Sequence, residues 1–594
     1  MRVTRLVISG FRGWDNLDLR PVGHVLLAGV PRAGRSDVIA ALVRVLDPDT
    51  ARSPSVADLR QHVEAPVPGE SQVTTRAEVA EIEVTLSDLD PDAQQLFDGC
   101  LEPLDLSGAA SDDLDANPFT PLCVRLAYRL TYDSDADVLD TVTYYPALSN
   151  PAISQYVRVP ATTRRALPVI NLSVSQPMQL RPGGRLRQII DGRDPLAAKQ
   201  AFQRLYDAVN AAIGALSTDP AITEAVDAVL QSGGAGARLG DVPITSADVG
   251  FLAEDGSIAA LLRTLQAAMR LDAAGLLALT NQGSTATAIL SVAEAMLLAN
   301  VPGAIVLADD FGDRLDTAAA EHLASVLRAR SGQVWLSTRR PEVARAFEPN
   351  ELVRLVRHGG TRAHHQLSTI TDRKALTAVR QLHTQLLAAL TAPTVAITEG
   401  PHDVAVYAKV DRRYPPGALP LSAHGVRLVA AGTGQDGGID QIPRVASLAR
   451  SLGFRVVALI DRDKDSPQSQ LQLQKIQETS DVVIRLPAGA IERAMLAGIG
   501  IDKVAGASSA LTAYGIPDPV AGLAGEAAFT KLCQVTHKQG LHEQLLEALY
   551  SETGVHPPMI KVVLDVLGAV ASPTYSGATL IDLAEIPRPA PESS

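Results

Sequence analysis

"VLLAGVPRAGRSDVIAALVRVL", residues 25–46, passes from an apolar strand pattern through a glycine-rich turn into a helical pattern. The turn fits the phosphate-loop pattern G-x-x-x-x-G-K-[ST] at Gly29, Gly34 and Ser36, but Arg35 stands where that pattern has lysine. The N–H groups and the dipole at the start of the helix favour an anion whichever residue occupies position 35. The stretch therefore predicts a strand, a phosphate-binding turn and a helix, with an unusual cation in the turn.

The composition bounds the class of protein. A chain of 594 residues is too long for one core, so about two to four domains are expected. Cys100, Cys123 and Cys533 form no C-x-x-C, which argues against a disulfide framework or a zinc site and indicates a reducing compartment. No signal-peptide pattern opens the chain, and no run approaches the ~20 apolar residues of a membrane span. We expect a cytoplasmic protein with no membrane partner.

The net charge of −13 does not by itself suggest a nucleic-acid-binding protein. Two segments are nevertheless rich in arginine, residues 158–193 and 339–380. Such segments either face phosphate groups or form an ordinary solvated surface. Total charge therefore leaves DNA binding open.

Two later strand patterns would complete a nucleotide site. In "GAIVLADDFGDRLD" (303–316) the apolar run ends in Asp309 and Asp310, and Asp309 stands where an ATPase holds Mg²⁺ through water. "GQVWLSTRRPEV" (332–343) ends in polar residues that include Arg339. Taken alone, each acidic or basic strand end is also typical of an ordinary turn.

This order of motifs resembles the ABC-type ATPase heads of the RecF and SMC group. In those heads a phosphate loop is followed by a signature turn, an acidic strand end and a strand ending in Ser-Thr-His. "NQGSTATAILSVAEAML" (281–297) stands in the signature place, and "ISGFRGWDNLDL" (8–19) resembles the first hairpin of the group. The resemblance implies a nucleotide site made of the following residues: Gly29, Gly34, Arg35, Ser36, Asp309, Asp310 and Arg339.

Three of these positions depart from the family pattern: Arg35 replaces lysine, Asp310 replaces glutamate and Arg339 replaces histidine. A guanidinium is larger and flatter than an ammonium, so it contacts phosphate from a different place. The Asp310 carboxylate is one methylene shorter, and a displacement of roughly an ångström can cost about 100-fold in rate. We expect an ATPase-like fold with weak or lost hydrolysis, so ATP is a doubtful cofactor. An active ATPase with unusual side chains and an unrelated fold remain the alternatives.

Two amphipathic helices are predicted within residues 195–232, in "PLAAKQAFQRLYDAVNAAIGAL" and "AITEAVDAVLQS". Paired helices inserted in an ATPase head often serve for dimerisation. Ordinary core helices would show the same pattern.

Three apolar strand patterns lie within residues 391–467. The first leads into "TEGPHD", which contains Glu399 and Asp403; the second ends in a glycine-rich turn; the third ends in "IDRDKD", which contains Asp461 and Asp463. Because these strands alternate with helical patterns, we expect a parallel sheet whose carboxyl ends lie on one edge. Carboxylates gathered there are costly unless a cation neutralises them, and oxygen ligands favour Mg²⁺ or Mn²⁺.

The pattern E-G-x-x-D, a strand with a glycine turn and then D-x-D resembles the TOPRIM domain of topoisomerases, primases and some nucleases. An ABC-type head followed by a TOPRIM domain resembles the OLD (overcoming lysogenization defect) family of nucleases, which includes the Gabija anti-phage nuclease. In that family a further acid follows a fourth strand, which makes Glu492 in "VVIRLPAGAIERAML" (482–496) a candidate metal ligand. The family also uses a late lysine, for which Lys538 and Lys561 are both candidates.

The resemblance implies a mechanism for phosphodiester cleavage. Glu399, Asp403 and Glu492 would hold one Mg²⁺, while Asp461 and Asp463 would hold a second or share the first. The lysine would offset charge in the transition state. Glu399 could instead act as a general base, and the sequence leaves both roles open.

The function that follows is a Mg²⁺-dependent endonuclease that nicks or cuts DNA, of the OLD type and active in anti-phage defence. Its partners would be DNA, further copies in a homodimer or higher homo-oligomer, and a protein from the same defence operon. Strand-passage or primase chemistry is an alternative, with Tyr407 or Tyr514 as nucleophile. An ATPase-like scaffold that recruits a partner and has little nuclease activity is another.

The expected fold is α/β: an ABC-type ATPase head with an inserted helical dimerisation element, then a TOPRIM parallel sheet and a helical C-terminal segment. The expected boundaries are 1–194 and 236–390 for the two parts of the head, 195–235 for the helical insertion, 391–500 for TOPRIM and 501–594 for the C-terminal segment with a disordered tail.

Overall fold

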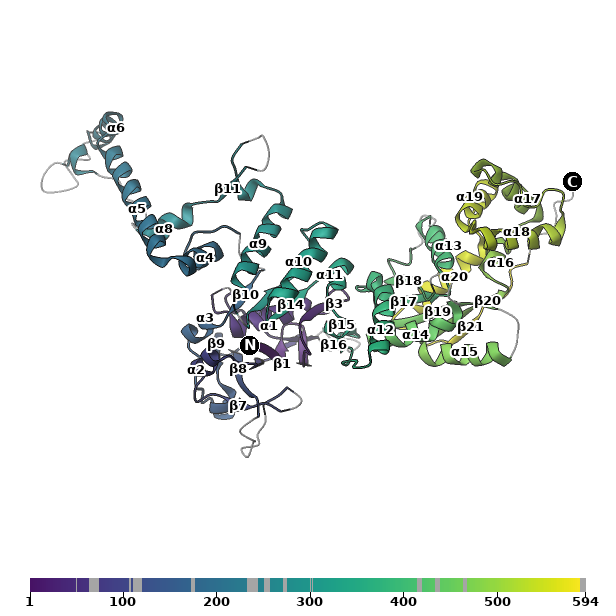
Figure 1. The fold of residues 1–594 in the computed structure, drawn as a ribbon, viewed down its shortest axis with the longest axis horizontal. Coiled ribbons are helices and arrows are strands. Elements are labelled where there is room, and N and C mark those ends of the chain that lie inside the picture. The colour runs from purple at the N-terminus through teal and green to yellow at the C-terminus, as the bar shows by residue number, and fades with distance from the viewer. Residues whose placement is uncertain are drawn as a thin grey trace.

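The computed structural model describes most of the chain, in the following ranges: 1–49, 51–63, 74–105, 108–110, 120–172, 177–231, 244–249, 257–270, 275–299, 301, 303–413, 419–432, 438–462 and 467–587. Of the residues singled out above, Asp463 lies outside these ranges, as do residues 588–594 of the expected tail. Figure 1 shows the arrangement of the described elements.

The chain begins with an antiparallel sheet in the order β2-β1-β6-β8-β7, with β9 paired to β8. Its strands are β1 (Arg2–Phe11), β2 (Trp14–Leu19), β6 (Val79–Ser87), β7 (Glu102–Pro103), β8 (Leu122–Asp133) and β9 (Val138–Tyr144). Buried positions recur at alternate residues through much of β1 and β6, as in a sheet with one face on a core. The hairpin of β1 and β2 forms where the sequence predicts two strands, and it pairs Phe11 with Trp14.

The second sheet has the order β10-β13-β14-β3-β15-β16 and is parallel except for β16, which runs antiparallel to β15. Its strands are β3 (Val25–Gly29), β10 (Val169–Asn171), β13 (Ile305–Ala308), β14 (Gln333–Ser337), β15 (Leu352–His358) and β16 (Thr361–Gln366). Every residue of β3, β13 and β14 is buried, which explains their continuous apolar runs. Since these strands are parallel, the segments that follow them meet at one edge.

Helix α1 (Arg35–Leu46) lies between the two sheets. It contacts β1, β6 and β8 on one side and β3, β13 and β14 on the other. The opposite face of the parallel sheet is covered by α9 (Ser284–Leu298), α10 (Thr317–Arg330) and α11 (Pro341–Arg345). The glycine-rich turn is thereby fixed between a buried strand and a buried helix.

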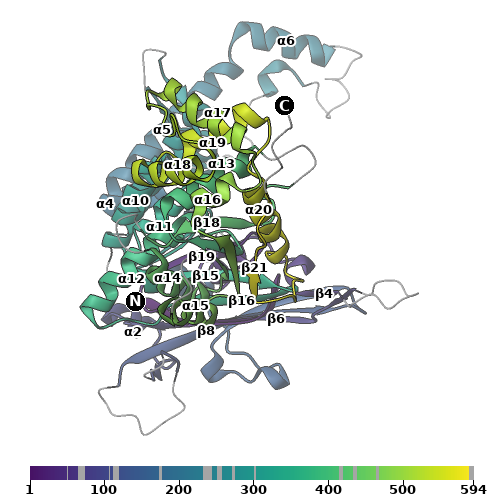
Figure 2. The same ribbon diagram turned by 90° about the vertical axis from the view of Figure 1, so that its right-hand side faces the viewer.

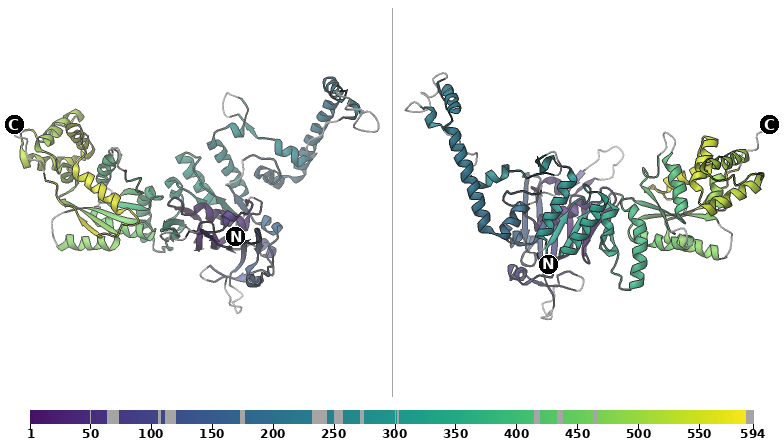
Figure 3. Two further views of the ribbon diagram at one scale, coloured as in Figure 1. Left: turned by 180° about the vertical axis from the view of Figure 1, so that it is seen from behind. Right: turned by 45° about the horizontal axis from the view of Figure 1, so that its top comes forward.

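A group of helices extends from the head and is seen in two orientations in Figure 3. It comprises α4 (Arg185–Arg193), α5 (Pro195–Ser217), α6 (Pro220–Gln231) and α8 (Ile258–Thr264). A small core of Ala198, Phe202 and Leu262 holds its base. We call α5 and α6 the helical arm; they occupy the segment for which paired amphipathic helices are predicted.

The C-terminal half is built on a wholly parallel sheet in the order β18-β17-β19-β20-β21. Its strands are β17 (Thr394–Thr398), β18 (Val426–Ala430), β19 (Arg455–Arg462), β20 (Val482–Ala488) and β21 (Leu580–Asp582). Helices α13 (Pro401–Arg412) and α20 (Pro558–Val570) lie on one face, and α14 (Gly438–Ser451) and α15 (Pro467–Thr479) on the other. Figure 2 shows the remaining helices grouped around α13: α16 (Ile491–Leu496), α17 (Ile501–Ala510), α18 (Gly525–Gln539) and α19 (His542–Thr553).

One apolar core continues from the parallel sheet of the head into the C-terminal sheet. It contains Leu26 and Val306 of the head together with Ile397 and Val456 of the C-terminal half. Helix α12 (Arg373–Leu386) joins the halves and packs on α14 and β18.

Arg354 on β15 is fully buried at this joint. Its guanidinium donates to the carbonyl oxygens of Leu452 at 2.9 Å and Leu390 at 3.4 Å, and also to that of Ala392. It lies 3.5 Å from the centroid of the Phe454 ring, and burial lowers its pKa to about 9. No carboxylate within the described ranges forms an ion pair with it. The side chain therefore fixes β15 to the segments that lead into β17 and β19.

None of the helices within the described ranges is both long enough and apolar enough to cross a lipid bilayer.

Candidate functional site

The turn after β3 is shaped by its contact with β15. The Val30 N–H donates to the Leu355 carbonyl oxygen at 3.1 Å, and Gly29 has a φ of 129°. A Cβ at Gly29 would lie 1.9 Å from the Leu355 carbonyl oxygen, so only glycine lets the chain leave the sheet here. Gly34 precedes α1 with a φ of 94°. The first N–H groups of α1 consequently lie at the carboxyl edge of the sheet, as a phosphate loop requires.

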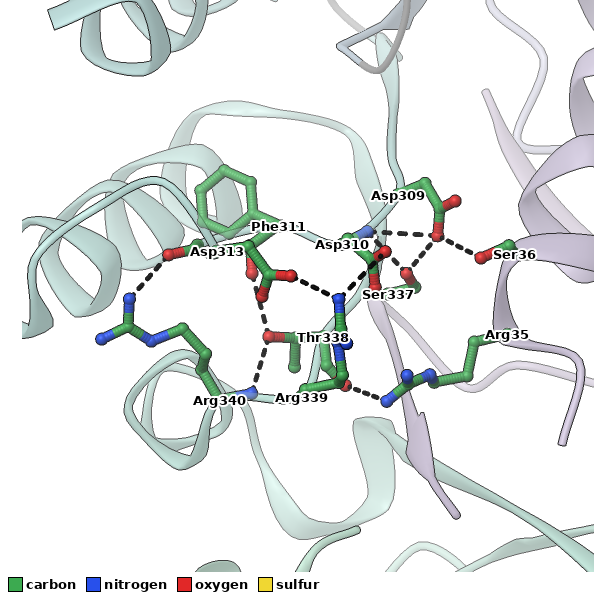
Figure 4. Close-up of polar contacts among 11 residues, drawn as sticks. Arg35, Ser36, Asp309, Asp310, Phe311, Asp313, Ser337, Thr338, Arg339 and Arg340 are labelled. Atoms are coloured by element: carbon green, nitrogen blue, oxygen red, sulfur yellow. Dashed lines mark hydrogen bonds and ion pairs between the residues drawn. The ribbon is translucent and has the colours of Figure 1, made fainter. Parts of the chain in front are cut away.

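Arg35, which replaces the expected lysine, turns toward the end of β14. Its Nη1 donates to the carbonyl oxygen of Thr338 at 2.9 Å (Figure 4). Burial lowers the pKa of this guanidinium, and the charge of Asp310 acts in the opposite direction. One N–H of this cation is thus bonded to the backbone of the head, which fixes the direction of the guanidinium.

Ser36 and Asp309 meet across the edge of the sheet. Ser36 Oγ donates to Asp309 Oδ1 at 3.0 Å, and Ser337 Oγ donates to the same oxygen (Figure 4). A hydroxyl beside a carboxylate at this place is the pair that holds Mg²⁺ in phosphate-loop proteins. The structure therefore brings together Gly29, Gly34, Ser36 and Asp309 at one edge.

Asp310 lies at a tight turn with a φ of 47°, a conformation that Asp adopts more readily than longer side chains do. Burial raises its pKa, and the charge of Asp309 raises it further. Arg339 Nη2 lies 3.5 Å from Asp310 Oδ2 and 2.6 Å from Asp313 Oδ2 (Figure 4). The charge of Arg339 acts in the opposite direction, but the pKa of Asp310 remains raised overall.

A basic pocket of about 410 Å³ opens beside the loop. Five arginines line it: Arg32, Arg35, Arg60, Arg357 and Arg362. Arg362 donates to Asp37 and lies over the Trp14 ring, and a Cβ at Gly34 would lie 2.3 Å from its Nη1. Arg60 pairs with Asp15 at 3.0 Å. Since the arginines outnumber these acids, the pocket retains a positive charge that suits a phosphate chain.

The two arginine-rich segments have largely structural roles. In 339–380, Arg345 pairs with Glu321, Arg380 pairs with Glu348, and Arg354 is buried as described. In 158–193, several arginines bond to acids or to backbone oxygens: Arg164 to the Arg44 oxygen, Arg165 to Asp49, Arg185 to the Ser291 oxygen and Arg187 to Asp191. Neither segment therefore forms an open basic strip along its length.

Glu399 and Asp461 meet at the carboxyl edge of the C-terminal sheet. The Asp461 N–H donates to Glu399 Oε1 at 3.1 Å, and Asp461 Oδ2 accepts the Ile491 N–H at 3.2 Å. The two acids follow β17 and end β19, which are neighbours in the sheet. We call Glu399, Asp403 and Asp461 the acidic edge.

Tyr407, on α13, lies under the acidic edge. It is fully buried, and burial raises its pKa well above the ordinary value, as do the charges of the three acids of the edge. The charges of all three acids raise the pKa of the same buried phenol, so the three carboxylates lie near one another. A phenol so enclosed is not placed to attack a DNA phosphate, and Tyr514, the other candidate, is exposed on the 3-10 helix Leu511–Tyr514.

Asp403 closes the first turn of α13, where its Oδ2 accepts the Gly400 N–H at 2.9 Å. Burial raises the pKa of Asp403, and the charge of Glu492 adds to this rise. Glu492 thus lies close enough to act on the acidic edge.

Glu492 is buried between two histidines that the sequence did not single out. His542 Nε2 lies 2.8 Å and His537 Nδ1 3.0 Å from Glu492 Oε1, and the His402 ring stacks on His542 at 4.5 Å. Burial acts to raise the pKa of Glu492, but the hydrogen bonds with His542 and His537 outweigh it and the pKa is lowered. These histidines lie on separate elements, so no spacing in the sequence marked them.

The donor chemistry of the acidic edge fits a hard cation, because its ligand atoms are all carboxylate oxygens. Within the described ranges, no group of three or more His, Cys, Asp or Glu side chains is arranged to hold a metal ion. Asp463, which is predicted to complete the set, lies outside those ranges.

The two candidate lysines are both exposed. Lys538 lies on α18 directly after His537, the partner of Glu492, whereas Lys561 lies on α20. The chain position of Lys538 favours it, but both remain predictions.

No family model matches the chain, and no curated protein does. Three solved structures align with the chain at 13% identity or less and at TM-scores of 0.34 or less. An SMC head bound to the C-terminal winged-helix domain of ScpA aligns with 62% of this chain and 98% of its own, at 13% identity and a TM-score of 0.34. The recombination mediator RecF aligns with 61% of this chain and 98% of its own, at 10% identity and a TM-score of 0.27. Stu0660 of Streptococcus thermophilus aligns with 79% of this chain and 99% of its own, at 8% identity and a TM-score of 0.31. The sheets and helices of the chain itself make it an α/β protein, with a mixed sheet in the head, a parallel sheet in the C-terminal half and helical segments.

Proposed function

We propose that this protein is a metal-dependent DNA endonuclease of the OLD type, which nicks or cuts DNA in anti-phage defence. The observation that carries the proposal is the contact between Glu399 and Asp461 at the carboxyl ends of adjacent parallel strands, at 3.1 Å between Oε1 and a main-chain nitrogen. With Asp403 they form an edge of carboxylates that needs a cation.

The residues of the edge have separable roles. Glu399, Asp403 and Asp461 would hold Mg²⁺ or Mn²⁺, together with Asp463 and Glu492. When bound, such ions would activate water and stabilise the leaving oxygen of a phosphodiester. The Asp461 N–H orients Glu399, and the Ile491 N–H orients Asp461, so each acid is held from the backbone. Lys538 or Lys561 would offset charge on the phosphate, and Glu399 retains a second role as general base.

In this proposal the head senses a nucleotide or acts only as a scaffold. Arg35 bonds to Thr338, and Arg339 pairs with Asp310 and Asp313, which favours weak or lost hydrolysis. The helical arm would join two copies, and a protein from the same operon would complete the assembly.

A scaffold with little nuclease activity is the second candidate. The observation that favours it is the pair of hydrogen bonds between Glu492 Oε1 and the ring nitrogens of His537 and His542. With Oε1 engaged in this way, Glu492 is less available to the edge as a metal ligand.

The test is cleavage of supercoiled plasmid by the full-length protein with Mg²⁺, Mn²⁺ or EDTA. We expect nicked or linear product with either metal and none with EDTA. Asp461→Asn should lower the rate about 100-fold or more, because a neutral amide cannot replace a carboxylate ligand.

Asp502→Asn is the matched control, since Asp502 is an exposed acid in the first turn of α17. It should leave cleavage unchanged. Absence of cleavage by the wild type with both metals, with and without its operon partner, would favour the scaffold.

A further inference from the structure

Helix α18 presents basic side chains on an exposed face close to the acidic edge. Lys531 and Lys538 are both exposed and lie two turns apart, about 10 Å along the helix axis. The opposite face of the helix buries Ala528, Phe529 and Leu532 in the C-terminal core, where α18 packs on α16 (Figure 1). The sequence between the two lysines contains no aspartate or glutamate. The outer face of α18 is therefore positively charged.

Arg493, on α16, extends this basic face toward the sheet. It is exposed, and its guanidinium carbon lies 5.8 Å from the centroid of the Phe529 ring on α18. Its stem crosses Gly489, where a Cβ would lie 2.7 Å from Arg493 Cδ. The Gly489 N–H donates at 3.1 Å to the carbonyl oxygen of Arg462, the residue after Asp461. The side chain of Arg493 thus runs from the carboxyl end of β20, beside the acidic edge, to α18.

We call Arg493, Lys531 and Lys538 the basic strip. Among the described residues, no ion pair and no side-chain hydrogen bond engages any of the three. Arg413, in the same half of the chain, is by contrast paired with Glu547 at 2.6 Å. In a chain with a net charge of −13, the strip is a local concentration of uncompensated positive charge.

His537 makes the strip continuous with the acidic edge. Its side chain is 78% exposed, yet its Nδ1 lies 3.0 Å from Glu492 Oε1. Lys538 follows His537 in the chain, and Arg493 follows Glu492. The charge of Glu492 in turn acts on Asp403 of the edge. A polyanion bound along the strip would therefore lie beside the carboxylates of the edge.

The chemistry of the strip fits the phosphate backbone of duplex DNA. The spacing of the two lysines, about 10 Å, corresponds to about three steps of about 3.4 Å along a DNA strand. Proteins that hold single strands stack bases on aromatic side chains, whereas Phe529, the aromatic residue of α18, is buried. Lysine and arginine contacts to phosphate carry no base information, so we expect binding to be independent of sequence.

We propose that the basic strip binds the phosphate backbone of duplex DNA and directs it onto the acidic edge. Arg493 and Lys531 contact phosphates at one end of the strip, and Lys538 contacts the phosphate nearest Glu492. This inference rests on the proposed function, because the strand that the strip holds is the strand that the edge would cleave. It adds the residues that hold the substrate before any chemistry takes place.

The test is binding of a short fluorescent DNA duplex to the full-length protein, measured by anisotropy over a range of salt concentrations. EDTA is present, so that no cleavage accompanies binding. Arg493→Gln and Lys531→Gln should each weaken binding about three- to tenfold and lower the slope of log K against log salt by about 1, because each removes one phosphate contact. Arg493→Lys keeps the charge and should retain most of the affinity, which a merely structural role of the arginine would not explain.

Arg427→Gln is the matched control. Arg427 is an exposed arginine near the amino end of β18, so it lies at the end of the parallel sheet opposite the acidic edge. Its substitution should leave both the affinity and the salt slope unchanged. Unchanged binding in Arg493→Gln and Lys531→Gln would overturn the inference, as would a wild type that does not bind the duplex. Tighter binding of single-stranded DNA or RNA than of the duplex would overturn the assignment of duplex DNA.

Cleavage of plasmid with Mn²⁺ separates this inference from the proposed function. Lys531→Gln should raise KM and leave kcat within about twofold, since the residue binds substrate but lies outside the acidic edge. A wild type that binds the duplex through the strip but cleaves no DNA would support the strip and contradict the nuclease. Cleavage by Lys531→Gln and Arg493→Gln with the wild-type KM would contradict the strip and leave the nuclease standing.

Discussion

The phosphate loop and the acidic edge are built alike and charged in opposite ways. Both lie at the carboxyl ends of buried parallel strands, β3, β13 and β14 in the head and β17 and β19 in the C-terminal half. In the head, Arg35 and Arg339 are engaged by groups of the protein itself. At the acidic edge, main-chain N–H groups donate to Glu399 and Asp461 and orient their carboxylates. The same sheet geometry thus presents guanidinium groups bonded to the protein in one half and carboxylates oriented from the backbone in the other.

The largest effect that this comparison predicts is at the acidic edge. Glu399→Gln should lower plasmid cleavage about 100-fold or more, because the amide keeps the hydrogen bond from Asp461 but removes the charge that binds a cation. Initial nicking rates in Mn²⁺, with circular dichroism to verify the fold, provide the measurement. A variant that retains more than a tenth of the wild-type rate would place the chemistry elsewhere.

The next effect concerns the joint that connects the two regions. Arg354→Met should lower the free energy of unfolding by about 3 kcal/mol, because three buried carbonyl oxygens lose their donor. Urea titration would measure it. Arg357→Met, at an exposed position of the same strand, is the control and should change stability by less than about 0.5 kcal/mol. Equal effects of the two substitutions would contradict the role assigned to Arg354.

A smaller effect depends on pH and arises in α12, which joins the halves. Burial lowers the pKa of His383 to about 4, and the charge of Glu348 opposes this. In the unfolded chain the imidazole of His383 has its ordinary pKa of about 6.5, so it takes up a proton there at a higher pH than in the fold. Wild-type stability should therefore fall as the pH drops from 6.5 toward 4. At pH 5 the loss from His383 is about 2 kcal/mol.

His383→Leu should remove that part of the acid sensitivity and leave stability at pH 7.5 similar. The measurement is the difference in unfolding midpoint between pH 7.5 and pH 5.0, compared for wild type and variant. An identical difference in both proteins would show that His383 does not titrate as its burial implies.

The smallest expected effect is at the phosphate loop. Arg35→Ala should change plasmid cleavage by less than about threefold, because Arg35 bonds to the head and lies far along the chain from the acidic edge. Release of phosphate from ATP, followed with the same preparations, should be weak or absent in the wild type. Measurable hydrolysis that vanishes in Arg35→Ala would reverse the comparison between the two regions.

Periodicity and motif order predict much of the fold and rather less of the site. The strands β1, β3, β13, β14, β17 and β19 each carry a continuous or alternating apolar run, which backbone geometry converts directly into a strand. Strand β21 is three residues long and near the end of the chain, so it gave no such signal. The meeting of Glu399 with Asp461 follows from parallel strand order alone.

Contacts between side chains far apart in the sequence could not be predicted. Arg362 reaches Asp37 across the head, and His537 and His542 reach Glu492 from two different elements. Such pairs depend on how the sheets and helices pack, and no local pattern encodes that packing.

The buried guanidinium of Arg354 also bears on how this chain can be divided by gene engineering. A boundary after residue 390 would separate Arg354 from two of the three carbonyl oxygens that it binds, those of Ala392 and Leu452, and would split the core that contains both Leu26 and Ile397. Each fragment would then expose apolar surface that the intact chain covers, and insolubility is the expected result. Because β15 also pairs with β3 in the head sheet, fusions should leave the head and the C-terminal sheet together in one chain.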